Sequence, residues 1–333
     1  MIPAALVALA LSVGALYQFV GVRRSRRRHA PPGRMVDAGG QRLHVVCAGS
    51  AGPPVLFEAG IAASSLSWTL VMREAAAFSR ACAYDRAGLG WSEPSRSPRS
   101  TARMMSELRG VLTAAAGSQP AVLVGHSFGA FLVLAFAAHH PRDVAALVLV
   151  DPPTEWDDMT PRQSRTLRGA IQLSRLGGLL ARVGVVRAGL ALLTGSAPGI
   201  PRNFVRVFGG TTARTLAHLV GEVRKLPAEV HPVVQAQWCQ PKCFRAMAEH
   251  LGALHETAAA ARRAGGVPDI PLVILSAGDH PPEVIADHRE LARLSPRGRH
   301  LVAAKSGHWI QLDEPDVVVA TIRDVVGSLQ SCA

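Results

Sequence analysis

Short apolar segments alternate with helical segments along most of the chain, and this alternation restricts the possible folds more than any other feature. The apolar segments are rich in aliphatic and β-branched side chains, and helical patterns such as residues 104–116 and 128–139 lie between several of them. Many are apolar on both faces, which is typical of parallel strands that helices cover on both sides. The sequence therefore predicts an α/β fold. The predicted strands are residues 55–58, 81–84, 121–124, 145–150, 272–275 and 300–303.

Two further strands are expected near the start of this region. Residues 34–36 and 41–47 flank Asp37-Ala38-Gly39-Gly40, and a glycine turn between two apolar segments predicts a β-hairpin. With the hairpin, the expected sheet has eight mostly parallel strands.

One long interval breaks the alternation. Residues 151–271 contain several helical patterns, punctuated by prolines, and no strand pattern. We expect residues 154–240 to form a helical cap over the sheet. The core is then divided into residues 34–153 and residues 241–333, and a helix at about residues 241–263 belongs to the covering layer of the sheet.

The N-terminus reads as a membrane anchor. Residues 3–22 carry no charge, and a helix of this length extends about 30 Å, the thickness of a bilayer core. Five arginines follow at residues 23–28, within a predicted basic and proline-containing linker at residues 23–33. The positive-inside rule then predicts a single-pass anchor at residues 1–22 with the rest of the chain on the cytoplasmic side. A cleaved signal would carry its positive charge before the apolar segment, so the alternative is an uncleaved or misidentified signal region.

Charge and cysteine content exclude some classes of protein. The net charge is +12, but much of it comes from the arginines near the anchor and from residues 161–225, which hold eleven basic residues and one acid. Aromatic residues make up 5% of the chain and no nucleic-acid-reading module is recognisable, so we expect no nucleic-acid partner.

The cysteines lack the spacing of a zinc site and are predicted to be isolated thiols. They are Cys47, Cys82, Cys239, Cys243 and Cys332.

The segment that carries chemistry is Gly125-His126-Ser127-Phe128-Gly129, between a predicted strand and a predicted helix. A serine on such a tight turn projects from the carboxyl edge of the sheet, and the glycines let the turn close. A serine nucleophile needs a base and a carboxylate that orients the base. Asp279 and His308 each follow a later strand, and a parallel sheet brings such loop residues to the edge that carries Ser127.

These features resemble the serine-nucleophile α/β-hydrolases over residues 34–333. The segment around Ser127 is similar to the nucleophile elbow of that family, residues 84–92 resemble its loop after the fourth strand, and residues 307–315 resemble its histidine loop. The resemblance implies that Ser127 is the nucleophile, His308 the general base and acid, and Asp279 the orienting carboxylate. It also implies an oxyanion hole from the backbone amides of Phe128 and Ile61. Ala59 occupies a position where the family often has histidine.

Other side chains compete for these roles. Asp151 also ends a predicted strand and is the alternative carboxylate. Asp85 and Arg86 are expected to stabilise their loop as a pair, and His126 is expected to pack beside the elbow rather than act as a second base.

The expected activity is hydrolysis of a carboxylic ester through an acyl-enzyme, without metal or organic cofactor, on a small-molecule or lipid-like substrate. Epoxide hydrolases and haloalkane dehalogenases need a carboxylate at the elbow, and Ser127 occupies that position, so these two activities are not expected. Thioesterase, amidase or cofactor-free haloperoxidase-like activity on the same triad, and an inactive binding module, remain open.

The cap has one suggestive pattern. Arg168, Arg175 and Arg182 recur every seven residues with leucines between them. They form either a solvated face or a lid that lies on anionic lipid.

Overall fold

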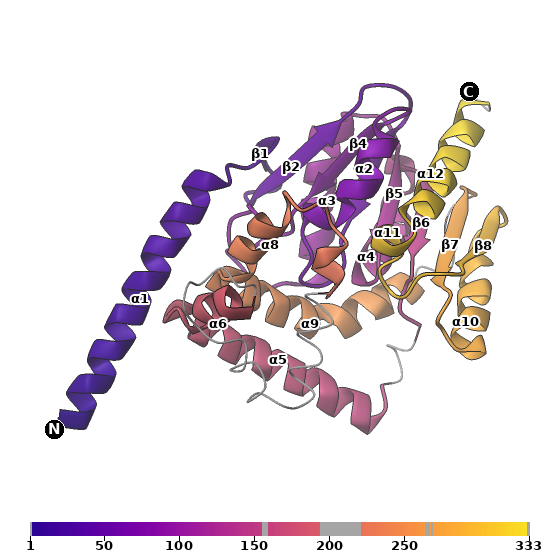
Figure 1. Cartoon of the computed structure of the whole chain (residues 1–333). Helices are drawn as coiled ribbons and strands as arrows, with labels where there is room; N and C mark the ends of the chain where they lie inside the picture. Colours follow the sequence, from indigo (N-terminus) through magenta and orange to yellow (C-terminus); the bar gives the residue numbers. More distant parts are fainter. Residues whose placement is uncertain (1, 155–158, 194–220, 264–266, 268, 332–333) are drawn as a thin grey trace.

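The eight predicted strands form one mixed sheet in the computed structural model, which describes residues 2–154, 159–193, 221–263, 267 and 269–331 (Figure 1). The strand order is β1-β2-β4-β3-β5-β6-β7-β8, with antiparallel pairing of β1 with β2 and of β2 with β4, and parallel pairing elsewhere. The predicted α/β fold is confirmed. The strands are β1 (Arg34–Asp37), β2 (Arg42–Ala48), β3 (Pro54–Glu58), β4 (Arg80–Tyr84), β5 (Ala121–His126), β6 (Val144–Val150), β7 (Leu272–Ala277) and β8 (Gly298–Ala303).

The predicted hairpin joins β1 and β2. The amide of Ala38 donates to the carbonyl of Gln41, and the carboxylate of Asp37 accepts from the amide of Gly40. Gly39 and Gly40 have φ values of 68° and 80°, a left-handed conformation that glycine adopts without steric cost.

Helices cover both faces of the sheet. The β5 side chains Val122 and Val124 pack on one face with α2 (Thr69–Ala75) and α12 (Pro315–Gln330). Leu123 points to the other face and packs with α3 (Thr101–Ala116), α4 (Phe128–His139) and α9 (Pro241–Arg262). Apolar residues are buried on both faces of the central strands, as their sequence predicts. Polar functional side chains are therefore expected where the strands end, at the carboxyl edge of the sheet.

Helices lie between β6 and β7, where the sequence predicts a cap. They are α5 (Pro161–Arg182), α6 (Val185–Leu193) and α8 (His231–Trp238), followed by α9. Thr160 caps α5 through a reciprocal pair of hydrogen bonds with Gln163. Helix α9 packs against both α4 of the core and α5, so it forms the platform that carries the cap. Parts of the expected cap, residues 155–158 and 194–220, lie outside the described residues.

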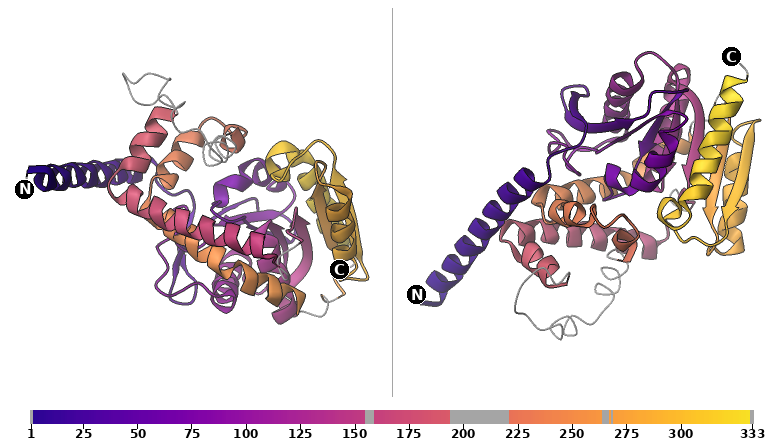
Figure 2. Two further views of the ribbon diagram at one scale, coloured as in Figure 1. Left: turned by 90° about the horizontal axis from the view of Figure 1, so that it is seen from below. Right: turned by 45° about the horizontal axis from the view of Figure 1, so that its top comes forward.

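The N-terminal helix α1 spans Ile2–Arg28. Residues 23–28, which we expected in a linker, are therefore helical, because nothing in the arginine-rich segment breaks the helix before the proline pair Pro31-Pro32. Among the described residues α1 is the one helix long and apolar enough to cross a membrane, and its apolar side chains are exposed. Its N-terminal half projects beyond the rest of the chain (Figure 2).

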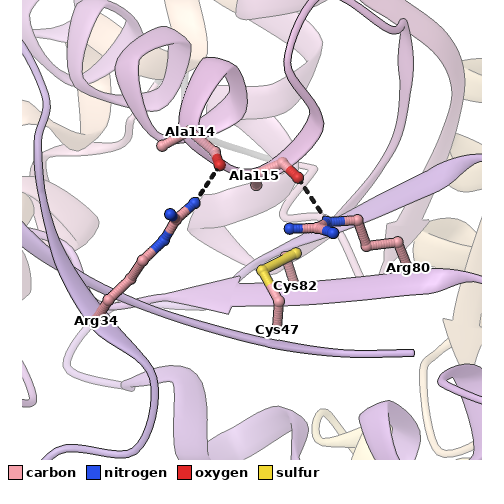
Figure 3. Close-up of a disulfide and its surroundings, with 6 residues drawn as sticks. All are labelled: Arg34, Cys47, Arg80, Cys82, Ala114 and Ala115. Atoms are coloured by element: carbon pink, nitrogen blue, oxygen red, sulfur yellow. Dashed lines mark hydrogen bonds between the residues drawn. A yellow bond between two sulfur atoms is a disulfide. The ribbon is translucent and has the colours of Figure 1, made fainter. Parts of the chain in front are cut away.

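Two cysteines correct the sequence interpretation. Cys47 of β2 and Cys82 of β4 are direct partners in the antiparallel ladder, with Cα atoms 4.1 Å apart, and they form a disulfide (Figure 3). The prediction of isolated thiols is wrong for this pair, because the pairing follows from strand register and not from spacing along the chain. Cys239 and Cys243 are buried free thiols, as predicted. Cys332 lies outside the described residues.

Candidate active site

Ser127 lies at the turn between β5 and α4. Its backbone has φ 52° and ψ −123°, a conformation that costs a non-glycine residue free energy. The surrounding packing holds it there, and the amide of Ser127 donates to the carbonyl of Val150 at the end of β6. The predicted strand, turn and helix are thus present, and the serine lies at the carboxyl edge of the sheet.

The two glycines of the motif are required by close packing. A Cβ atom on Gly125 would lie 2.6 Å from the carbonyl oxygen of Gly129. A Cβ on Gly129 would lie 2.7 Å from the carbonyl oxygens of both Glu58, the last residue of β3, and Ala59, which follows it. The first turn of α4 therefore packs directly on the backbone that leads to Ile61.

We expect Gly129→Ala to disrupt this contact. The added methyl group meets backbone atoms that cannot rotate away, so the variant should lose roughly 1–3 kcal/mol of unfolding free energy and displace the loop after β3. Urea unfolding together with ester turnover checks both effects. Gly252→Ala in α9 is the matched control: no atom lies within 4 Å of its added Cβ, so that variant should be neutral or slightly more stable. Equal stability of the two variants would contradict the packing argument.

His308 lies between β8 and the short helix α11 (Ile310–Asp313), and its partner is a carboxylate at the end of β6. Nδ1 of His308 lies 2.6 Å from Oδ2 of Asp151. The Asp151 side chain is 1% exposed and that of His308 is 44% exposed, so a buried carboxylate orients a ring that substrate can reach. A neutral ring that donates from Nδ1 has a basic Nε2. Among the described residues no hydrogen bond joins Nε2 to Ser127 Oγ.

The carboxylate that contacts His308 in the structure is Asp151, whereas the resemblance implies Asp279. Asp279 follows β7 as predicted, but no described hydrogen bond joins it to His308, and its carboxylate is turned toward Gly307, where an added Cβ would lie 3.2 Å from Oδ2. The alternative, Asp151, makes the contact instead. The path of the histidine loop explains the difference: the carbonyl of His308 accepts from His126 at the end of β5, so the loop after β8 crosses back to β5 and its neighbour β6.

Asp151 also binds a histidine that the sequence argument missed. Nε2 of His280 lies 2.8 Å and 3.0 Å from the two carboxylate oxygens, and the amide of Ala277 donates to Oδ1 at 2.9 Å. Burial by itself would raise the pKa of Asp151, but the hydrogen bonds from His308 and Ala277 outweigh it and lower that pKa. The sequence feature that could have indicated His280 is its position directly after Asp279, at the end of a predicted strand.

His126 packs beside the elbow, as expected. Its ring is buried and lies 4.7 Å from the His308 ring, centroid to centroid. Burial and the neighbouring His308 lower the pKa of His126 to about 3, so it is neutral at physiological pH. Its Nε2 donates to the carbonyl of His308 at 2.8 Å. His126 therefore positions the backbone of the histidine loop.

The loop after β3 lies against the serine. A Cβ on Gly60 would be 3.4 Å from Cβ of Ser127, which brings the following residue, Ile61, close to the elbow. Phe128 is the first residue of α4, so its amide belongs to the free N-terminal donors of that helix. These positions are compatible with the expected amide pair, whose catalytic role stays a proposal.

Arg86 holds the same loop from behind. Its guanidinium donates to the carbonyls of Ala59 at 2.6 Å and Gly60 at 2.5 Å, and it forms a buried ion pair with Glu58. The expected pairing of Arg86 with Asp85 is wrong, although each stabilises a loop. Asp85 instead contacts the buried His44 at 2.9 Å. Glu58 and His44 were missed because no motif marks them.

No group of three or more His, Cys, Asp or Glu side chains able to hold a metal is found in the described part of the chain.

Comparison with known proteins agrees with this fold. Residues 53–181 match the family model described as the alpha/beta hydrolase fold. An uncharacterised protein, YqjL of Bacillus subtilis, is 36% identical over 104 residues, which cover 31% of this chain and 41% of that protein. An AB hydrolase superfamily protein of Gibberella zeae is 25% identical over 300 residues, which cover 82% of this chain and 86% of that protein. The match to YqjL thus spans less than half of that protein's length.

Solved structures extend the likeness to nearly the whole chain. The epoxide hydrolase VrEH1 from Vigna radiata aligns with a TM-score of 0.66 at 16% identity and covers 89% of this chain and 97% of that one. At this identity the likeness concerns the fold alone. The chain therefore has the α/β-hydrolase fold, with the eight-stranded, mostly parallel sheet of that fold.

Proposed function

We propose that the chain is a serine hydrolase that cleaves a carboxylic ester. The observation that carries the proposal is the placement of Ser127 on a strained turn at the sheet edge where Asp151 orients His308. A serine at this turn favours acyl chemistry, because the alkylation that opens an epoxide or displaces a halide needs a carboxylate there.

In the proposed reaction Ser127 Oγ attacks the ester carbonyl while Nε2 of His308 takes the hydroxyl proton. The carbonyl oxygen becomes an oxyanion, which the amides of Ile61 and Phe128 stabilise. As the C–O bond breaks, His308 returns the proton to the departing alcohol. Water then attacks the acyl-enzyme with His308 again as base, releasing the acid and restoring Ser127. Asp151 stays ionised and stabilises the imidazolium in both half-reactions.

A fluorophosphonate probe followed by p-nitrophenyl esters of increasing chain length tests this proposal. We expect the probe to label the chain and at least one ester to turn over. Matched thioester and amide substrates distinguish the thioesterase and amidase alternatives, since they use the same triad. Failure of both labelling and turnover would favour a binding module built on the same fold.

We also propose that α1 anchors the chain in a membrane. Its exposed apolar side chains and the arginines in its last turn support an anchor whose basic end lies on the cytoplasmic side. The Cys47–Cys82 disulfide favours the opposite placement, because disulfides persist in oxidising compartments. We retain the cytoplasmic orientation because the arginine cluster adjoins the apolar segment directly.

In a bacterial host, a fluorescent or enzymatic reporter fused after Ala333 is therefore expected to be active only in the cytoplasm. In that case Cys47 and Cys82 should react with an alkylating reagent added during lysis, since cytosolic reductants keep thiols reduced. A reporter active only outside, together with cysteines that resist alkylation until reduced, would overturn the orientation but leave the anchor intact.

A further inference from the structure

The C-terminal half of α1 is joined to the cap. Gln18 is buried despite lying within the apolar helix: its Nε2 donates to the carbonyl of Cys239 at 2.7 Å, and its Oε1 accepts from Nε of Arg187 at 2.9 Å. Gly14 lies directly against the carbonyl oxygen of Val183, at the end of α5. These contacts fix α1 relative to α5 and α6.

The length of the free part of α1 limits how it meets a bilayer. From Ile2 to Gly14 a helix rises about 18 Å, whereas the apolar core of a bilayer is about 30 Å thick. The free half of α1, which projects from the rest of the chain in both views of Figure 2, is therefore too short to cross alone. A bilayer that surrounds the whole apolar segment of α1 must also contact the end of the cap against which Gly14 packs.

That end of the cap exposes apolar side chains. Ser174 and Ala181 are buried on the inner side of α5. The outer side of its C-terminal half carries exposed leucines, and the first residue of α6 adds one more exposed apolar side chain to them. Outside α1 and this patch, the large apolar side chains exposed in the described residues are Leu301 and Val302 of β8. We name this patch the cap face. Its members are Leu173, Leu176, Leu179, Leu180 and Val185, with exposures of 54%, 49%, 56%, 37% and 51%.

Arginines border the cap face. Arg168, Arg175 and Arg182 follow one edge of α5, and among the described residues none has a carboxylate within 4 Å. A cavity of about 600 Å³ opens behind this edge, between α5, α9 and residues 96–99. The arginines that line it are Arg96, Arg99, Arg175, Arg182 and Arg245, with Glu249 as the acidic residue. An apolar patch edged by arginines is complementary to acyl chains and anionic headgroups.

We infer that the cap face continues the apolar surface of α1 and docks into the leaflet on the side of the α1 arginines, in an anionic bilayer. The leucines enter the outer acyl region and the arginines meet the phosphates. The cap is thereby held at the membrane surface. This inference rests on the proposed anchor but not on the proposed ester hydrolysis.

Depth measurements on the full chain test the inference. In a background with Cys47→Ala, Cys82→Ala and Cys332→Ser, single cysteines replace Leu176 on the cap face, Leu9 on α1 and Leu301 on β8. Each is labelled with the environment-sensitive fluorophore NBD; Cys239 and Cys243 are buried. The proteins are placed in nanodiscs of phosphatidylcholine with or without phosphatidylglycerol. Quenching by lipids with a nitroxide on the acyl chain reports depth, and quenching by iodide reports contact with water.

We expect the probe at 176 to be quenched by the nitroxide lipids and to show a several-fold smaller iodide quenching constant than the probe at 301. Phosphatidylglycerol should increase the lipid quenching at 176, and Arg168→Gln, Arg175→Gln and Arg182→Gln together should remove that increase. Fluorophosphonate labelling of the same samples reports the proposed hydrolase separately.

Three results would overturn the inference. The probe at 176 could behave like the one at 301, while the probe at 9 is quenched by lipid; the anchor would then stand and the cap face would lie in water. The probe at 176 could resist both quenchers, which would mean that a protein surface such as a second copy of the chain covers it. A probe at 9 that escapes lipid quenching would remove the anchor and the docking surface together.

Discussion

Replacing Ser127 with alanine is expected to abolish fluorophosphonate labelling and to lower ester turnover at least about 10³-fold, because the members of a catalytic triad act as a unit. The variant should fold, since alanine keeps the Cβ atom and tolerates the backbone of the elbow no worse than serine does. Probe labelling followed by gel fluorescence measures the first effect, and initial rates on the best ester measure the second.

Ser331→Ala is a suitable control, because Ser331 is exposed at the end of α12 and contacts only the carbonyl of its own helix. It should label and turn over as the parent chain does. Persistent labelling of the Ser127→Ala protein would show that another residue is the nucleophile and would remove the basis of the proposed reaction.

The second large effect concerns the carboxylate. Asp151→Asn is expected to lower turnover by about 10²–10⁴-fold, because an amide can donate to His308 and so stabilise the wrong tautomer of the ring. Asp279→Asn should change turnover by only a few-fold, since the structure places no hydrogen bond between Asp279 and His308. Rates measured over a range of pH show whether the remaining activity of each variant depends on the same base.

This order is the reverse of the one that the chain order Ser127, Asp279, His308 suggests. If Asp279→Asn proves the more damaging change, then Asp279 replaces Asp151 as the partner of His308 in the working enzyme. The two variants form a matched pair, because both remove one negative charge from a strand end at the same edge of the sheet.

Local sequence pattern was sufficient to predict most of the fold and to select two residues of the candidate site. Strands buried on both faces must be apolar throughout, so β3 and β5 to β7 are readable from the sequence. The glycines around Ser127 are readable for a similar reason, since the turn and its packing on the loop after β3 leave no room for a Cβ. His308 was found because it follows a strand within a motif that resembles a known histidine loop.

Tertiary structure alone decided which partners meet. Asp151 and Asp279 both follow strands, and His308 meets Asp151 because the loop after β8 returns to His126 at the end of β5, beside β6. The Cys47–Cys82 disulfide depends in the same way on β2 lying beside β4 in a particular register. The sequence determined what each segment is, because burial and backbone conformation are local demands. The sequence did not show which segments are neighbours, because the contacts between segments depend on how the strands and loops of the whole chain are arranged.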